Sequence, residues 1–209
     1  MTIILISILL VIWSIWGYLS SRVESAAYTI IKKTKEYEVR DYPPHIVAQT
    51  TVQGSYEEAM NAGFRIIANY IFGGNKKRES IAMTAPVTAQ KKEKNTSSEN
   101  IAMTAPVVAT KEGNAHTISF GMPRSYSLDT LPTPNDSRVK ITTIPEKKYA
   151  VLRFSWYRSN KRIMRMQEKL QASLTRDKIT TKGNMAYAGY NAPWTPPWMN
   201  RNEVMIEIV

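Results

Sequence analysis

The sequence predicts an α+β fold, in which duplicated strand–helix–strand halves form one twisted, barrel-like β-sheet flanked by two helices. Short runs rich in β-branched and aromatic residues alternate with turn residues, as expected of strands. Each half also contains one amphipathic helix that follows a serine. A constant offset of 104 positions relates the halves and carries Val47 onto Val151, Ser55 onto Ser159 and Ala82 onto Ala186. Such matching spacing without a gap suggests an old duplication.

The run from Thr2 to Ser21 carries no charged side chain and consists mostly of Ile, Leu, Val and Trp. About 20 such residues span a bilayer core as a helix, and aromatic residues near one end are typical of a membrane interface. We therefore expect residues 1–27 to be a membrane anchor and short linker, and residues 28–209 to be the folded domain. A signal peptide cleaved near Ser25-Ala26-Ala27 stays open as an alternative, although no positive n-region precedes the run.

The chain has 209 residues, a formal net charge of +11 and no cysteine. The positive charge favours anionic partners such as lipid headgroups, nucleic acid or carboxylate-bearing ligands, or simply aids solubility. The lack of cysteine excludes disulfides, thiolate metal sites and cysteine nucleophiles. Basic residues after the apolar run favour a cytoplasmic domain, whereas an N-terminus acting as an export signal favours the periplasm. We expect a single-pass anchor and leave the side of the membrane open.

The first half is predicted to contain three strands and one helix. The strands are expected at residues 28–31, 37–40 and 45–52. Ser55 and Glu58 form a capping box that opens the helix, and Gly73-Gly74 closes it. Apolar residues recur between these ends at helical spacing, so one face of the helix should pack on the sheet.

A heptad, Ile-Ala-Met-Thr-Ala-Pro-Val, occurs twice, at residues 81–87 and 101–107. Its apolar residues alternate onto one face, which predicts a strand for each copy. Because proline cannot donate a ladder hydrogen bond, Pro86 and Pro106 should lie at bulges or free edges. Another strand is expected from His116 to Met122.

Residues 125–137 are rich in Pro, Asp and Ser and are predicted to connect the halves. The second half should contain a helix from Ser159 to about Thr175. The proline-rich run 191–198 is predicted to be an ordered loop that presents Trp194 and Trp198 to the core, to an apolar cleft or to a bilayer interface. The remaining strands are expected at residues 139–144, 149–154, 185–190 and 204–209.

The second helix carries a stripe of basic residues beside its apolar face. Cations near a helix N-terminus oppose the macrodipole, so the stripe serves either an anionic partner or a plain solvated surface. The stripe consists of Arg158, Lys161, Arg162, Arg165 and Lys169.

No catalytic constellation is recognisable, because the chain lacks a phosphate-binding glycine loop, a nucleophile elbow and a paired-histidine zinc motif. It also lacks a helix-turn-helix and an aromatic-basic RNA motif, so nucleic acid is not an expected partner. The two histidines, His45 and His116, lie 71 positions apart. We interpret His116 as an exposed strand residue, and His45, which follows two prolines, as either structural or a ligand contact.

Four separated segments resemble, in order, the SOUL haem-binding-protein family. The doubled heptad and the Pro-Trp-Thr-Pro-Pro run resemble its bacterial branch, and the resemblance covers about residues 28–209. It implies a duplicated fold similar to the effector-binding domains of some bacterial transcription regulators. It also implies binding of haem or another tetrapyrrole in an apolar groove by the first helix. The segments are Tyr37 to Tyr42, the heptad, Ala188 to Asn191, and Arg201 to Val204.

The resemblance implies a ligand site by the first helix, where we expect its polar edge to take part, and we add His45 as the only histidine near Asp41. Arg65 could pair with a propionate, and His45 is a tentative ligand of haem iron because imidazole is a common axial ligand. Asp41 stands where one branch of the family has a histidine. Met83 and Met103 are interpreted as core filling rather than as iron ligands. The helix residues of the candidate site are Asn61, Arg65, Ala68 and Asn69.

The sequence therefore predicts a membrane-tethered binding protein for haem or a related tetrapyrrole, acting as a carrier or buffer. A binding domain for another small amphiphilic molecule in the same groove is the alternative. An enzyme is the least favoured class, because no acid–base or nucleophile set is visible.

Overall fold

The computed structural model of the protein describes residues 2–20, 24–77, 97–192 and 194–209. The first copy of the heptad, with Met83 and Pro86, lies outside the described residues. The strand expected there therefore stays a prediction.

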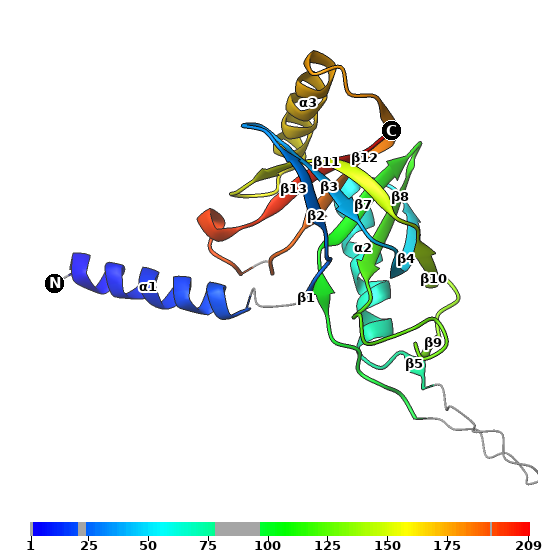
Figure 1. Ribbon diagram of the computed structural model, residues 1–209. Coiled ribbons are helices and arrows are strands. Elements are labelled where there is room, and N and C mark those ends of the chain that lie inside the picture. The colour runs from blue at the N-terminus through cyan, green and yellow to red at the C-terminus, as the bar shows by residue number, and fades with distance from the viewer. Residues whose placement is uncertain (1, 21–23, 78–96, 193) are drawn as a thin grey trace, which may run out of the picture.

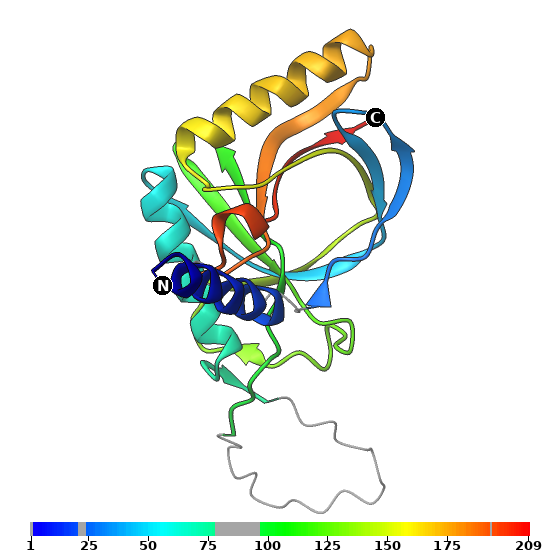
Figure 2. The ribbon, with the colours of Figure 1, turned by 90° about the vertical axis from the view of Figure 1, so that its left-hand side faces the viewer.

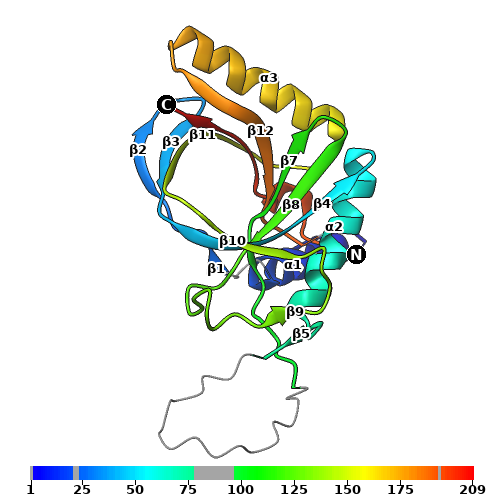
Figure 3. The same cartoon turned by 90° about the vertical axis from the view of Figure 1, so that its right-hand side faces the viewer.

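Nine strands form one antiparallel sheet in the order β10-β4-β8-β7-β12-β13-β11-β3-β2. The sheet curls round on itself, and the two long helices of the domain lie on its convex side (Figures 1 and 3). This architecture confirms the predicted α+β fold. The strands are β2 (Thr29–Lys33), β3 (Glu38–Tyr42), β4 (His45–Gln53), β7 (Val107–Glu112), β8 (Ala115–Gly121), β10 (Lys140–Ile144), β11 (Lys147–Phe154), β12 (Thr181–Gly189) and β13 (Asn202–Ile208).

The two halves exchange one strand each. β3 of the first half pairs with β11 of the second, and β10 of the second half pairs with β4 of the first. The helices α2 (Tyr56–Ile71) and α3 (Asn160–Arg176) begin 104 positions apart, as the offset predicts. The predicted repeat of strand–helix–strand halves is therefore confirmed, but each half of the sheet is completed by a strand from the other half.

Helix α2 begins with the predicted capping box. The Ser55 hydroxyl accepts from the Glu58 backbone N–H, and the Glu58 carboxylate accepts from the Ser55 N–H at 3.1 Å. Its inner face packs on β4 and β8, since these strands carry Ala48, Ile118 and Phe120 toward it. The buried residues of α2 are Ala59, Gly63, Ile67, Tyr70 and Ile71.

Replacing Ser55 with alanine is expected to lower the free energy of unfolding by about 1 kcal/mol, because the first turn loses its side-chain acceptor. Urea denaturation followed by circular dichroism measures the change. Ser55→Asn is the control, since asparagine also caps helices and should preserve most of the stability. Equal stability of the alanine variant and the natural protein would contradict the role of this cap.

Alternate residues of the strands point to opposite sides of the sheet. Val39 and Leu152 pack under α3 with Leu170 and Leu174. Their strand neighbours point into the curl, where a separate cluster forms on the concave face. That cluster contains Tyr42, Val151, Ala186, Ala188 and Met205.

The second heptad is a strand only in part. Ile101 is buried under α2, and strand β6 (Thr104–Ala105) is separated from β7 by Pro106. This break agrees with the prediction that Pro106 interrupts the ladder. The main strand lies further along the chain than the expected residues 101–107, because β7 starts at Val107 and continues to Glu112.

Helix α1 (Thr2–Ser20) extends away from the sheet and meets the domain at the short helix η1 (Pro197–Met199) (Figures 1 and 2). Judged over the described residues, no helix has the length and apolar character needed to cross a membrane. The single-pass anchor expected from the sequence is therefore not shown by the structure. Three two-residue strands complete the fold: β1 (Glu24–Ser25), which pairs with β6, and β5 (Asn75–Lys76), which pairs with β9 (Thr133–Pro134).

Candidate functional site

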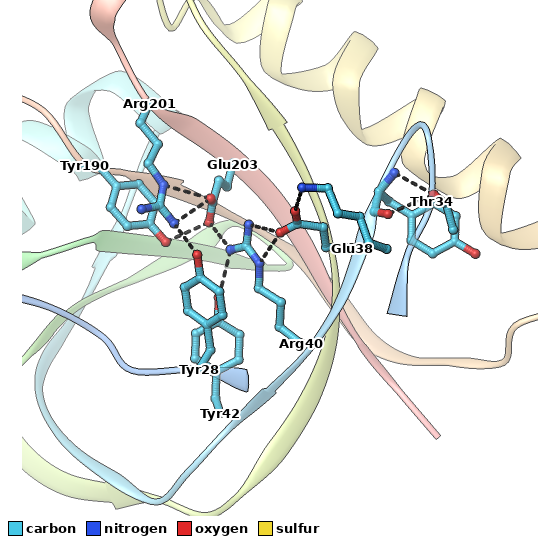
Figure 4. Close-up of polar contacts among 10 residues, drawn as sticks. Tyr28, Thr34, Glu38, Arg40, Tyr42, Tyr190, Arg201 and Glu203 are labelled. Atoms are coloured by element: carbon cyan, nitrogen blue, oxygen red, sulfur yellow. Dashed lines mark hydrogen bonds and ion pairs between the residues drawn. The ribbon is translucent and has the colours of Figure 1, made fainter. Parts of the chain in front are cut away.

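A buried ionic network occupies the concave face of the sheet (Figure 4). It is built from three of the four segments that carry the family resemblance. β3 contributes Arg40 and Tyr42, β13 contributes Glu203, and Tyr190 and Arg201 flank the ends of β12 and β13.

Glu203 is the centre of this network, and its side chain is fully buried. One carboxylate oxygen, Oε2, accepts from Arg40 Nη1 at 2.9 Å and from the Tyr190 hydroxyl at 2.7 Å. The other oxygen, Oε1, accepts from Arg201 Nε at 2.9 Å and lies 2.8 Å from Arg201 Nη2. Two guanidinium groups thus share one carboxylate.

The Arg40 side chain is only 2% exposed. Its Nε donates to Glu38 Oε2 at 2.9 Å, and its Nη1 donates to the Tyr42 hydroxyl at 3.2 Å. The guanidinium carbon also lies 4.2 Å from the centre of the Tyr28 ring, a cation–π contact. Two arginines and two glutamates balance in charge, which is what allows the group to be buried.

Burial and ion pairing fix the protonation states of the residues in this network. Burial and the nearby charge of Glu203 raise the pKa of Tyr190 above its ordinary value. Burial also raises the pKa of Tyr42 to about 12, although Arg40 opposes the shift. Burial alone would lower the pKa of Arg40, but its hydrogen bonds and charge interactions with Glu203 and Tyr42 together outweigh that effect and raise the pKa. Both phenols are therefore protonated at neutral pH, and neither is poised for acid–base chemistry.

His45 lies elsewhere, at the start of β4. It lines a pocket of about 310 Å³ together with Ala26, Thr104 and Arg124, between the N-terminal linker and the end of β8. Its Nδ1 is 2.9 Å from the carbonyl oxygen of Pro43. If Nδ1 carries the proton, Nε2 keeps a lone pair that can bind a ligand.

The four helix residues of the predicted site lie along α2, and none of them lines the pocket of His45. Asn61, Arg65 and Asn69 are exposed, and Ala68 is half-buried. Arg65 Nε donates to the carbonyl oxygen of Asn61 at 3.3 Å. The structure therefore brings these four side chains together on one helix but keeps them apart from His45.

The interpretation of His116 as an exposed residue is wrong. Alternate residues of β8 are buried beneath α2, and His116 shares that phase with Ile118 and Phe120. The side chain is 4% exposed and lies edge-on to Tyr56, with ring centres 5.9 Å apart. Burial, with a smaller contribution from Lys111, lowers the pKa of His116, which favours the neutral imidazole.

Solved structures with this curled sheet define the class of the fold. The C-terminal domain of EcmrR is 9% identical, covers 87% of this chain and 98% of its own, and superposes with a TM-score of 0.59. A protein described as a hydrolase from Listeria innocua is 8% identical, with coverage of 86% and 94% and a TM-score of 0.53. At these identities the likeness concerns the fold alone. The chain thus belongs to the same α+β fold class as these proteins.

The sequence places the chain more narrowly within that class. The family described as SOUL heme-binding protein matches residues 23–99 and 90–207. Heme-binding protein 2 of Homo sapiens is 29% identical over 168 residues, which are 79% of this chain and 74% of that protein. The chain belongs to the SOUL haem-binding protein family, and this membership supports haem as the expected cofactor.

Proposed function

We propose that the protein is a membrane-tethered binding protein for haem or a related tetrapyrrole, and not an enzyme. Its membership of a haem-binding family carries this proposal. The concave network supports binding over catalysis, since the carboxylate of Glu203 is fully engaged by two arginines and a tyrosine. Such a carboxylate is not available as a base or a nucleophile.

The outer surface of α2 is proposed as the binding groove. Phe64 of α2 and Phe72, the residue that caps the C-terminus of α2, are 39% and 60% exposed, and with Ala68 they are spaced four residues apart. Residues four apart share one helix face, so these side chains form an apolar strip. Asn61, Arg65 and Asn69 lie beside this strip. A porphyrin could bury one face on the strip and place a propionate at Arg65.

The pocket lined by His45 is the second candidate position for haem. The imidazole is the strongest iron ligand on offer there, and Arg124 could pair with a propionate after release from Glu24, which lies 3.7 Å away. A tetrapyrrole in the groove would contact Arg65, whereas one in the pocket would contact His45. Variants of these two residues therefore separate the two positions.

Haem titration of the full chain, followed by its Soret band, tests both positions. His45→Ala is expected to shift the Soret maximum if this imidazole ligates iron, while much of the affinity remains because apolar burial supplies it. Arg65→Ala is expected to weaken binding about tenfold without a spectral change, the effect of losing one charge-assisted hydrogen bond. Arg165→Ala on α3 is the matched control and should bind like the natural protein.

Two results would change the proposal. If neither variant alters a saturable titration, haem binds at another place on the protein. If the natural protein gives no saturable titration, the groove serves another small amphiphilic ligand, and the haem proposal is wrong.

The membrane tether is proposed for residues 1–27. Support comes from the apolar side chains that α1 leaves open to solvent, among them Ile4, Leu9, Ile12 and Trp16, which are 56–66% exposed. Apolar residues exposed around a helix favour transfer into lipid.

Full-length protein is expected to stay with membranes after a high-salt wash, because salt screens ionic contacts but not apolar insertion. Deletion of residues 1–21 should release the protein into the supernatant. Sedimentation followed by immunoblotting measures both. A full-length chain that remains in the supernatant, or a mature N-terminus at Tyr28, would contradict the tether.

A further inference from the structure

We propose that the folded domain itself docks onto a bilayer containing anionic phospholipid, through a surface of exposed aromatic residues. This inference deepens the proposed membrane tether and rests on it. We call this region the tryptophan surface. It consists of Trp13 and Trp16 of α1, Trp156 and Tyr157 before α3, Trp194 before η1 and Trp198 within η1.

Specific contacts assemble this surface. Trp13 Nε1 donates to the carbonyl oxygen of Trp194 at 2.9 Å, and the Trp13 ring lies edge-on to Trp198 with centres 5.4 Å apart. The backbone N–H of Trp156 donates to the backbone carbonyl oxygen of Pro197 at 2.9 Å. α1, the loop before α3 and the proline-rich loop are thereby connected. Figure 2 looks onto this side of the molecule, where α1 points toward the viewer next to η1.

Close packing also joins α1 to the proline-rich loop. Gly17 is buried, and a Cβ atom at its position would lie 2.5 Å from Cδ of Pro196. A glycine is therefore needed where the helix meets the loop. The contact fixes α1 against the domain on the side where the tryptophans lie.

The exposure of these indoles is unusual. All five tryptophans of the chain belong to the tryptophan surface, and each is between 39% and 64% exposed. Tryptophan is highly buried on average in soluble proteins. A connected group of exposed indoles is typical of the lipid headgroup region, where the ring meets apolar chains and its N–H meets polar groups.

The backbone holds the indoles in this outward position. Thr195, Pro196 and Pro197 are buried, so they anchor the loop while Trp194 and Trp198 on either side stay exposed. Trp156 has a φ of 83°, a left-handed conformation that a bulky residue rarely adopts. Strain of this kind persists where the surrounding structure imposes it, and it often marks a functional surface.

Positive charge adjoins the tryptophan surface. Arg158, which follows Tyr157 directly, is exposed, as are Lys161 and Arg165 of α3, and the first turn of α3 contains no acidic residue. Cations at a helix N-terminus oppose the macrodipole, so they do not serve the stability of α3. They complement anionic headgroups, which is why we infer a lipid surface rather than a protein partner.

Tryptophan fluorescence of the full chain tests this docking. In a Trp13→Phe/Trp16→Phe variant, α1 stays apolar and the remaining indoles report only on the folded domain. Phosphatidylglycerol vesicles with brominated acyl chains are expected to quench this fluorescence relative to unbrominated vesicles. Pure phosphatidylcholine vesicles should quench less. Further substitution of Lys161→Glu and Arg165→Glu should reduce quenching by the anionic vesicles.

A reporter away from the surface is the control. The segment between β8 and β9 lies on the side of the sheet away from α1 (Figure 1), and its Leu128 is 45% exposed. A chain with Leu128→Trp as its only tryptophan, the others being changed to Phe, should not be quenched. Equal quenching of this reporter would overturn the proposal, because it would indicate unspecific adsorption.

Vesicle sedimentation in the same samples separates docking from tethering. Protein that sediments with vesicles but is not quenched retains its tether and has no docked domain. Protein that neither sediments nor is quenched has lost both. If the indoles become buried without lipid and ultracentrifugation shows a dimer, the tryptophan surface joins two copies of the chain. Each of these results contradicts the inference.

Discussion

Replacing Glu203 with glutamine is expected to lower the free energy of unfolding by about 3–5 kcal/mol, since it removes one partner from a buried ion pair. The amide preserves the shape of the side chain but leaves the charge of Arg201 without a partner in the network and that of Arg40 with Glu38 alone. Arg40 is nearly as buried as Glu203, so water cannot compensate for the loss. Urea denaturation of the variant and the natural protein gives the difference directly.

Glu207→Gln is the matched control on the same strand. Glu207 pairs with Lys147, but both side chains are partly exposed, at 22% and 30%. Partly exposed pairs contribute less than about 1 kcal/mol. A loss for Glu203→Gln no greater than that for Glu207→Gln would mean that the network does not stabilise the fold.

Replacing Gly63 with valine is expected to cost about 3 kcal/mol, although glycine is normally the weaker helix former. A Cβ atom at this position would lie 2.5 Å from Cγ1 of Ile118 and 2.9 Å from its Cβ. Ile118 is fully buried on β8 and cannot move aside. The helix would therefore have to lift from the sheet, and thermal or urea denaturation would record the loss.

A double-mutant cycle with Ile118→Ala assigns the cause. Truncation of Ile118 opens space for the new side chain, so the valine should be less destabilising in that background. Additive effects of the two substitutions would contradict a direct clash. Asn61→Ala on the exposed side of the same helix should leave stability nearly unchanged or slightly increased.

The helices could be predicted from the sequence because their signals are local. A serine cap, an apolar stripe and a terminating turn are all read within twenty residues, and both α2 and α3 begin where these signals place them. The exchange of β3 and β10 between the halves has no such signal. Pairing partners lie about a hundred positions apart, and either strand would fit either edge by its own pattern.

The buried network was not predicted for a related reason. Glu38 and Arg40 look like surface residues of an edge strand, and so do Arg201 and Glu203. Their alternation does place each pair on one face, which is the signal that could have revealed them. The two pairs of charged residues come close together only because β3 and β13 both pair with the same strand, β11. The polar residues Asn61, Arg65 and Asn69, in contrast, could be assigned to one helix face from helical periodicity alone.

The strand exchange also has a consequence for biosynthesis. β4 is complete at Gln53, yet its edge partner β10 ends only at Ile144. At translation rates of about 5–20 residues per second, that edge stays unpaired for roughly 5–20 s. An unpaired edge can recruit strands from other nascent chains. The N-terminal half thus leaves the ribosome as an incomplete sheet, and a chaperone or early lipid contact by α1 would protect it during this interval.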